Sequence, residues 1–266
     1  MSSVSIHGIN LLSRIPVRRG PRHKSEMVSE LLFGERYTVL AEDGEWLRIK
    51  CTADRYRGWI QRDQYSSDDA PRKERGRYFS YDWCEPVRVG DRTTLVPMGA
   101  ELRGYDGMSF IYADSKLAFH GRVIDSAHNV WTADKMIKLA KKYLNVPYLW
   151  GGRSPHGIDC SGYVQVIMRF FGVHLPRDAS QQIGRGDEVG LIAAAQVGDL
   201  AYFSSERDSD RITHVGILLD RGEIIHASGR VRIDRCDQEG IYREDADRYT
   251  HYLKSIKRLQ AYFATD

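Results

Sequence analysis

The segment at residues 147–162, PYLWGGRSPHGIDCSG, constrains the fold of this chain more than any other part of the sequence. Its four glycines and two prolines favour an irregular loop, and it leads directly into an apolar stretch at residues 160–171 with helical spacing. Cys160 is therefore predicted in the first turn of a helix, with Asp159 at the N-cap. A fold for this chain must present that cysteine where a tight loop becomes a helix.

This position has a chemical consequence for Cys160. A helix N-terminus carries partial positive charge and free N–H groups. Both favour a thiolate, so we expect the pKa of the Cys160 thiol to be lowered. The same N–H groups can stabilise the oxyanion that forms when sulfur attacks an amide carbonyl. Cys160 is therefore a candidate nucleophile, and Asp159 is also placed to bind a ligand amine.

Two histidines downstream can supply the base that a nucleophilic cysteine needs. His214 and His226 lie on the arms of a predicted hairpin, residues 214–219 and 223–227, around a turn at 220–222. Antiparallel pairing can make the two histidines neighbours across the ladder. We interpret His214 as the base and His226 as the polar group that sets its tautomer.

Other interpretations exist for each residue taken alone. A cysteine that starts a buried helix also fits a packed core thiol, and a strand histidine fits a core or surface residue. Zinc bound by Cys160, His214 and His226 is an alternative, although a cysteine without a second nearby ligand makes a poor metal knuckle. A phosphate-binding loop fails, because Cys-Ser-Gly stands where Lys-Ser/Thr is required. The conjunction of the three residues favours the nucleophile.

The 266 residues suffice for two or three domains. In the first half, short apolar runs separated by Gly and Asp turns predict small β barrels. The polar stretch 66–77 divides that half into units at 1–66 and 67–127. Residues 128–266 show a different pattern. They predict a helix at 132–144 with Thr132 as N-cap, the helix at Cys160, then antiparallel strands and a last strand or helix at 254–263. The predicted class is α+β, preceded by small all-β domains.

The remaining composition excludes several partners. A net charge of +3 with interleaved signs gives no case for nucleic acid. The four cysteines form no Cys-x-x-Cys pair, which argues against a zinc ribbon. Residues 1–17 lack a signal-peptide pattern, and no run approaches the ~18–20 apolar residues of a membrane span. We expect a cytoplasmic monomer with free thiols, without cofactor, metal, membrane or nucleic-acid partner.

The motifs of the second half resemble the NlpC family of bacterial cell-wall cysteine peptidases. The matching pieces are PYLWGG at 147–152, GIDCSG at 157–162, LPR at 175–177 with Ser180 and Gln181, VGDL at 197–200, THVGI at 213–217 and IHA at 225–227. The resemblance covers about residues 130–260 and implies a papain-like core. It implies Cys160 as nucleophile, His214 as base and His226 as orienting residue. Tyr148 would help the oxyanion, and Ser161 and Ser180 belong to the implied substrate-binding set.

The first half resembles bacterial SH3-like domains through LLFGE at 31–35, Gly44-x-Trp46 and YRGWI at 56–60. SH3-like units before an NlpC-type domain are similar to γ-D-glutamyl-L-diamino-acid endopeptidases, which cut murein peptides with a free N-terminal L-Ala. The resemblance implies that Asp159, with Tyr56 and an acidic residue such as Glu35, holds that ammonium. Residues 78–130 match the SH3-like pattern poorly, so a second such unit rests on length and strand rhythm.

Three functions compete on this basis. The first is a cytoplasmic peptidase that recycles free murein peptides, and we favour it. The second is a secreted lytic enzyme that acts on intact peptidoglycan. The third is a catalytically inactive wall-binding protein, which the three filled catalytic positions disfavour. Acyl transfer through the same thioester is a variant of the first two.

Overall fold

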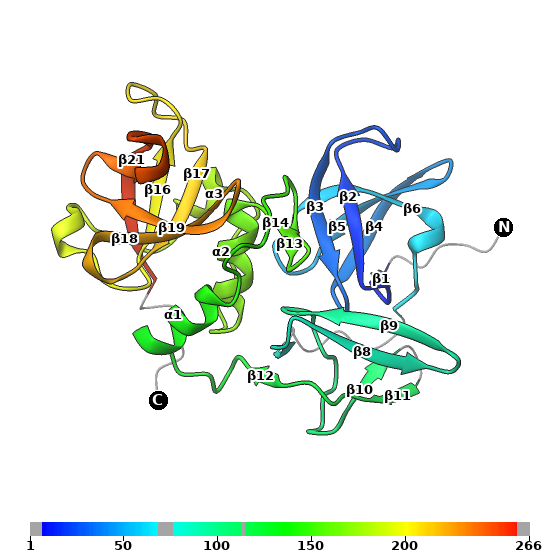
Figure 1. Cartoon of the computed structure of the whole chain (residues 1–266). Helices are drawn as coiled ribbons and strands as arrows, with labels where there is room; N and C mark the ends of the chain where they lie inside the picture. The colour runs from blue at the N-terminus through cyan, green and yellow to red at the C-terminus, as the bar shows by residue number, and fades with distance from the viewer. Residues whose placement is uncertain (1–6, 69–76, 113–114, 260–266) are drawn as a thin grey trace. The chain divides into compact units, whose positions relative to one another are not determined.

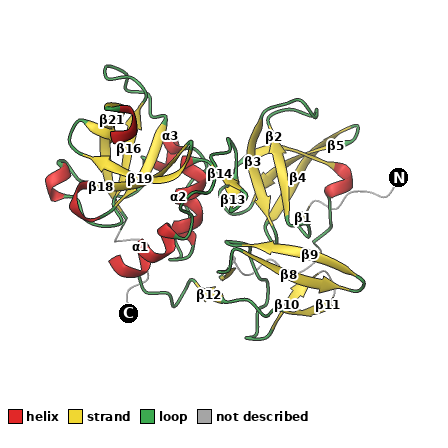
Figure 2. Ribbon diagram, viewed as in Figure 1, coloured by secondary structure: helices red, strands yellow, loops and turns green. Residues whose placement is uncertain are grey.

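A computed structural model describes residues 7–68, 77–112 and 115–259 of the chain (Figure 1). It divides into two compact units, Met1–His128 with Trp150–Pro155, and Asn129–Leu149 with His156–Asp266. The segment Trp150–Pro155 therefore belongs to the first unit although its neighbours in sequence belong to the second. Strands dominate both units, and the α-helices lie in the second (Figure 2).

The first unit begins with a six-stranded antiparallel sheet in the order β1-β4-β5-β6-β2-β3. Its strands are β1 (His7–Ile9), β2 (Arg14–Arg18), β3 (Met27–Leu32), β4 (Arg36–Asp43), β5 (Trp46–Cys51) and β6 (Arg57–Gln61), followed by the short 3-10 helix η1 (Arg62–Gln64). Alternate residues of β2 point inward, so Ile15 and Val17 are fully buried while Arg14 and Arg18 are not. They share one core with Leu31, Leu47 and Ile60.

The rest of the first unit consists of paired short strands. They are β7 (Tyr78–Ser80) with β12 (Val123–Asp125), β8 (Cys84–Val89) with β9 (Arg92–Pro97), and β10 (Ser109–Tyr112) with β11 (Ser115–Ala118). A separate aromatic core lies among them, and it includes Phe33, Phe110 and Phe119. The boundary expected at 66–77 lies mostly outside the described residues, and the division of this half into two SH3-like domains stays a prediction.

The helices of the second unit are α1 (Ala133–Lys141), α2 (Cys160–Arg169) and α3 (Ala179–Gln182). Helix α1 has the predicted N-cap, because the Thr132 side chain accepts from the backbone N–H of Lys135. It ends at Lys141, earlier than the expected residue 144. The chain then turns through Asn145, whose φ of 68° leaves the helical region. Helix α2 begins at the predicted residue and ends two residues before the expected Phe171.

The sheet of the second unit runs β15-β21-β16-β17-β18-β19-β20, and β21 also pairs with β20. Six strands therefore close into a barrel. Its strands are β15 (Asp187–Glu188), β16 (Leu200–Ser204), β17 (His214–Leu218), β18 (Glu223–Ser228), β19 (Arg230–Cys236), β20 (Gly240–Arg243) and β21 (Arg248–Arg258). The element expected at 254–263 is the end of the longer strand β21, and residues beyond 259 lie outside the described part.

The second unit has a barrel interior and a layer of helices outside the barrel. Alternate strand residues fill the interior, among them Ala201, Phe203, Leu218, Ile224 and Ile241. Helix α2 packs against β17 and β18 on the outer face (Figure 1). The remaining short elements are β13 (Arg153–Ser154), β14 (Gly157–Ile158), η2 (Ile192–Ala194), η3 (Asp220–Gly222) and η4 (Glu244–Ala246). Within the described residues, no helix is long and apolar enough to cross a membrane.

Candidate active site

Cys160 is the first residue of α2, as the loop-to-helix transition predicts. Asp159 is the N-cap, and its Oδ1 accepts from the backbone N–H of Gly162 at 2.7 Å. The helix is buried along its whole length, and Cys160 is only 6% exposed. The loop before α2 has thus placed a buried thiol at a helix N-terminus.

The burial of Cys160 changes the expected electrostatics. The pKa of the thiol is raised to about 12, chiefly by burial and also by the neighbouring Asp159 carboxylate. The backbone N–H groups of Val215 and Ser161 and the charge of Arg177 lower the pKa, but they do not outweigh burial. The helix N-terminus acts in the expected direction, yet the expectation of a lowered net pKa is not supported. The raised pKa favours the thiol form of the sulfur, which therefore needs a base to remove its proton.

The hairpin of β17 and β18 brings His214 and His226 together. The pairing places His226 opposite Gly216, two residues beyond His214 and on the same face of the sheet. His214 Nε2 lies 2.8 Å from His226 Nδ1, and both rings are buried. Gly216 makes the approach possible, because a Cβ there would lie 2.9 Å from His226 Cβ and 2.7 Å from Ile224 Cδ1.

Asp234, which is not among the site residues predicted from sequence, extends this pair. Its Oδ2 lies 2.9 Å from His226 Nε2. Arg232, on the same face of β19, donates from Nη2 to Asp234 Oδ1 at 2.7 Å. Two charged residues at alternate positions of a strand that faces a barrel interior were the available signal. Their partner depends on the pairing of β18 with β19, which only the fold supplies.

His251, on β21, is a second residue that sequence reasoning missed. Its ring stacks on His214, with centroids 4.1 Å apart and an angle of 28° between the planes. It also meets His226 edge to face at 5.9 Å. Nothing local in the sequence distinguishes this histidine, because the closure of the barrel by β21 is what brings it beside β17.

The three imidazoles suppress one another's charge. Burial lowers the pKa of His214 well below 6.5, and the nearby His251 and His226 lower it further. Burial lowers the pKa of His226 as well, although Asp234 opposes this. The pKa of His251 falls to about 4, chiefly because of burial. At neutral pH the site therefore contains neutral rings, and His214 is able to accept a proton.

Asp159 and Ser161 belong to a buried polar network with Arg177. The Arg177 guanidinium donates to both carboxylate oxygens of Asp159, at 3.0 Å to Oδ1, and to Ser161 Oγ at 2.8 Å. All three side chains are less than 9% exposed. A substrate ammonium that approaches Asp159 would share the carboxylate with this guanidinium. The role of Asp159 in amine binding stays a prediction, while its role as helix cap is observed.

Tyr148 lies beside the nucleophile, and Ser180 lies on α3. Burial raises the pKa of the Tyr148 phenol, and the charges of Cys160 and Asp159 add to the effect. The phenol therefore keeps its proton and can donate to an oxyanion. Its backbone is held by a hydrogen bond from its N–H to the Gly229 carbonyl at 2.9 Å. Ser180 is exposed, and its substrate contact stays a prediction.

Glu35 and Tyr56, the residues expected to select a free amine, lie in the first unit. Glu35 is 2% exposed and pairs with Arg153, whose two terminal nitrogens lie 2.8 and 3.0 Å from its oxygens. Glu35 Oε2 also accepts from the backbone N–H of Leu32 at 2.9 Å. Tyr56 is partly buried against the barrel core. Their contacts with substrate stay predictions.

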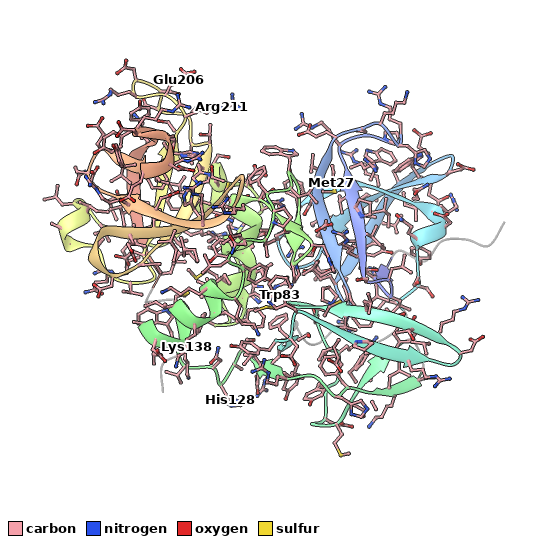
Figure 3. The ribbon with its side chains drawn as sticks, in the orientation of Figure 1. Met27, Trp83, His128, Lys138, Glu206 and Arg211 are labelled. Atoms are coloured by element: carbon pink, nitrogen blue, oxygen red, sulfur yellow. The ribbon has the colours of Figure 1, made fainter. Side chains whose placement is uncertain are left out.

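The segment Trp150–Pro155 also binds a second glutamate of the first unit, Glu30. The backbone N–H of Arg153 donates to Glu30 Oε2 at 2.8 Å, and Arg14 lies 3.1 Å from Glu30 Oε1. Burial raises the pKa of Glu30 despite these contacts. The Trp150 indole donates to Glu26 at 2.7 Å, near Met27, which Figure 3 labels. Gly151 has a φ of 79° and lies so close to Met27 that a Cβ would clash with the Met27 carbonyl.

The zinc alternative finds no support in the arrangement of these side chains. Across residues 7–68, 77–112 and 115–259 no group of three or more His, Cys, Asp or Glu has the geometry of a metal site. Both ring nitrogens of His226 already have hydrogen-bond partners, one in His214 and one in Asp234. The arrangement fits acid–base chemistry at a cysteine.

A buried cysteine at a helix N-terminus, packed against an antiparallel barrel that carries its histidine base, defines a papain-like cysteine peptidase. Residues 145–249 match the NlpC/P60 family, and residues 17–64 match the bacterial dipeptidyl-peptidase SH3 domain. The chain thus carries an NlpC/P60 domain and an N-terminal bacterial SH3 domain, and it is a cysteine peptidase. The α+β class and the SH3-like start predicted from sequence are confirmed.

Similar proteins match this chain over most of its length. The γ-D-glutamyl-L-lysine dipeptidyl-peptidase of Bacillus subtilis (strain 168) is 28% identical over 213 residues, covering 75% of this chain and 71% of that protein. Dipeptidyl-peptidase 6 of Lysinibacillus sphaericus is 26% identical over 253 residues, covering 85% and 90%. The crystal structure of an NlpC/P60 family protein from Bacillus cereus ATCC 10987 matches with a TM-score of 0.80 at 19% identity, covering 95% and 99%. That last likeness concerns the fold alone.

Proposed function

We propose that this enzyme cleaves the γ-D-glutamyl–L-diamino-acid bond of free murein peptides that carry an N-terminal L-Ala, and that it does so in the cytoplasm during peptide recycling. The observation that carries the proposal is the similarity, over three quarters of the chain, to a relative named for γ-D-glutamyl-L-lysine dipeptidyl-peptidase activity. The four cysteines are free thiols, which accords with a reducing compartment.

The geometry supports a two-step reaction. Cys160 Sγ attacks the γ-glutamyl carbonyl while His214 takes the thiol proton. The N–H groups at the start of α2 and the Tyr148 hydroxyl face the developing oxyanion. The amide C–N bond breaks, and His214 returns the proton to the departing amine of the diamino acid. Water, deprotonated by His214, then hydrolyses the thioester and releases the dipeptide.

Digestion of defined substrates tests the proposal. We expect release of L-Ala-γ-D-Glu from L-Ala-γ-D-Glu-L-lysine or its diaminopimelate counterpart, measured by mass spectrometry, and no cleavage of the N-acetylated peptide. Cys160→Ala provides the control, since it should retain the fold and lose turnover. Cleavage of the blocked peptide, or release of fragments from intact sacculi, would instead favour a wall-lytic enzyme.

A further inference from the structure

Three buried groups form a line of hydrogen bonds behind the nucleophile. His214 Nε2 lies 2.8 Å from His226 Nδ1, and His226 Nε2 lies 2.9 Å from Asp234 Oδ2. None of the three side chains is more than 8% exposed. With water excluded, each hydrogen bond needs one donor and one acceptor from the protein itself. The protonation of one group therefore fixes that of the next.

The line is anchored at Asp234. Burial alone would raise the pKa of this carboxyl, but hydrogen bonds from His226 and Arg232 outweigh it, and the net pKa is lowered. Asp234 is therefore an acceptor at neutral pH, and His226 Nε2 must carry a proton to donate to it. Since burial keeps His226 neutral, its Nδ1 has a lone pair and accepts from His214 Nε2–H. His214 Nδ1 is then left without a proton.

We propose that Asp234 is a positioning residue that sets the tautomers of both His226 and His214, so that Nδ1 of His214 is the nitrogen that accepts the thiol proton. The inference rests on the proposed cysteine-peptidase chemistry and deepens it. Asp234 does not touch substrate or sulfur. When the Cys160 proton moves to His214 Nδ1, the Nε2–H bond to His226 persists, and the carboxylate stabilises the new positive charge through the His226 ring.

Arg232 holds the carboxylate in this orientation. It donates from Nη2 to Asp234 Oδ1, and its Nε lies 2.7 Å from Oδ2. Arg232 is held in turn by Asp245, which also binds Arg243. The charged and titratable groups around the two catalytic rings are thus Asp234, Arg232, Arg243 and His251. Among these, the carboxylate of Asp234 is the group that accepts a hydrogen bond from His226.

Replacement of Asp234 by asparagine tests the assignment. An amide oxygen that faces Arg232 Nη2 leaves the amide nitrogen to donate to His226 Nε2. That donation reverses the direction of the hydrogen bonds along the line. His226 Nδ1–H then donates to His214 Nε2, and the proton of His214 moves to Nδ1. A reversed tautomer at the orienting residue of a protease base costs about 10⁴-fold in kcat in the Ser-His-Asp case, and about 10²–10⁴-fold is expected here.

The experiment uses the full chain and two readouts. Ring 15N NMR of the wild-type protein should show Nε2–H tautomers for both His214 and His226, and Asp234→Asn should show Nδ1–H at His214. Alkylation of Cys160 by iodoacetamide should slow in parallel. Asp187→Asn, which changes an exposed carboxylate on β15 of the same sheet, is the matched control and should leave both readouts unchanged.

The outcomes separate this inference from the proposed function. A wild-type His214 that carries its proton on Nδ1 would overturn the tautomer assignment even if Asp234→Asn did not fold. An Asp234→Asn variant with unchanged tautomers and an unchanged alkylation rate would overturn the role of Asp234. Both readouts need no murein peptide, so failure to cleave L-Ala-γ-D-Glu-L-lysine would count against the substrate alone.

Discussion

At the scale of single residues, the surroundings of His214 keep its ring neutral and able to accept a proton. His214 is enclosed by protein, stacked on His251 and hydrogen-bonded to His226. Burial and both neighbouring rings make its protonated form unfavourable, so its pKa lies well below 6.5. The pKa of the Cys160 thiol is raised, which favours the neutral thiol. Proton transfer therefore accompanies the attack on substrate, and a resting thiolate–imidazolium pair is not favoured.

The pH dependence of catalysis should reflect this. Since His214 must be neutral to act as base, kcat/KM should stay level as the pH falls through 6.5 and decline only at lower pH. His251→Phe keeps an aromatic ring in the stack but removes its titrating charge, so it should move the acid limb toward higher pH. Initial rates between pH 4 and 8 would check both curves. An acid limb at about 6.5 in the wild type would contradict the lowered pKa.

Substitutions at His226 should depend on hydrogen-bonding polarity. An amide at this position can accept from His214 Nε2–H through its oxygen and donate to Asp234 through its nitrogen. His226→Gln should therefore keep much of the activity, whereas His226→Ala should lose about 10²-fold or more in kcat. Steady-state kinetics on the same peptide would compare them, with circular dichroism as the folding control. Equal losses in the two variants would contradict an orienting role.

At the scale of elements, the β17–β18 hairpin and the start of α2 meet to form the site. Gly216 is the residue of β17 directly opposite His226. Its missing side chain gives the two histidine rings the space to form their hydrogen bond. The strand residues on the other face, Val215 and Ile217, are fully buried. The hairpin thus presents catalytic groups on one face and packs on the other.

Gly216→Ala tests this close approach. The added methyl would lie 2.9 Å from His226 Cβ, so the strands must shift apart or the His226 ring must turn. We expect lower kcat and a loss of stability of about 1–3 kcal/mol, typical of overpacking in a buried site. Urea unfolding and kinetics would measure the two effects. Gly222→Ala, in the turn of the same hairpin, is a matched glycine control for the kinetics. Full activity in Gly216→Ala would show that the rings tolerate the crowding.

The sequence predicted those elements whose signals are local. A run of Gly and Pro before an apolar stretch placed Cys160 at a helix start, and Asp-Arg-Gly at 220–222 placed the hairpin turn. The places of Asp234 and His251 in the site were not predicted, because they depend on strand pairing and barrel closure. The direction of the Cys160 pKa was also wrong, since the helix N-terminus is visible in sequence but the depth of burial is not.

At the scale of the whole molecule, the second unit places three neutral histidines together in buried surroundings. Each has a folded-state pKa below 6.5. In the unfolded chain the same residues take up protons near that ordinary value. Below pH 6.5 the unfolded state therefore binds more protons, and the site that supplies a neutral base reduces stability in acid.

We expect the free energy of unfolding to fall as the pH drops below 6.5, with a slope of up to about 1.4 kcal/mol per pH unit for each histidine. For His251 the window ends near its folded pKa of about 4. Denaturant melts between pH 4 and 8 would give the slope. His251→Phe removes one titrating group and should make the slope shallower. An identical slope in both proteins would contradict the burial of a neutral His251.

The barrel closes only when β21 pairs with β16 and β20, and β21 is the last described strand of the chain. A nascent polypeptide that has emerged from the ribosome through β18 already holds its nucleophile and its base. Until β19 and β21 follow, the base lacks both Asp234 behind its partner ring and the imidazole stacked upon it. Hydrolytic competence is thereby deferred until β21 has been synthesised and the barrel can close.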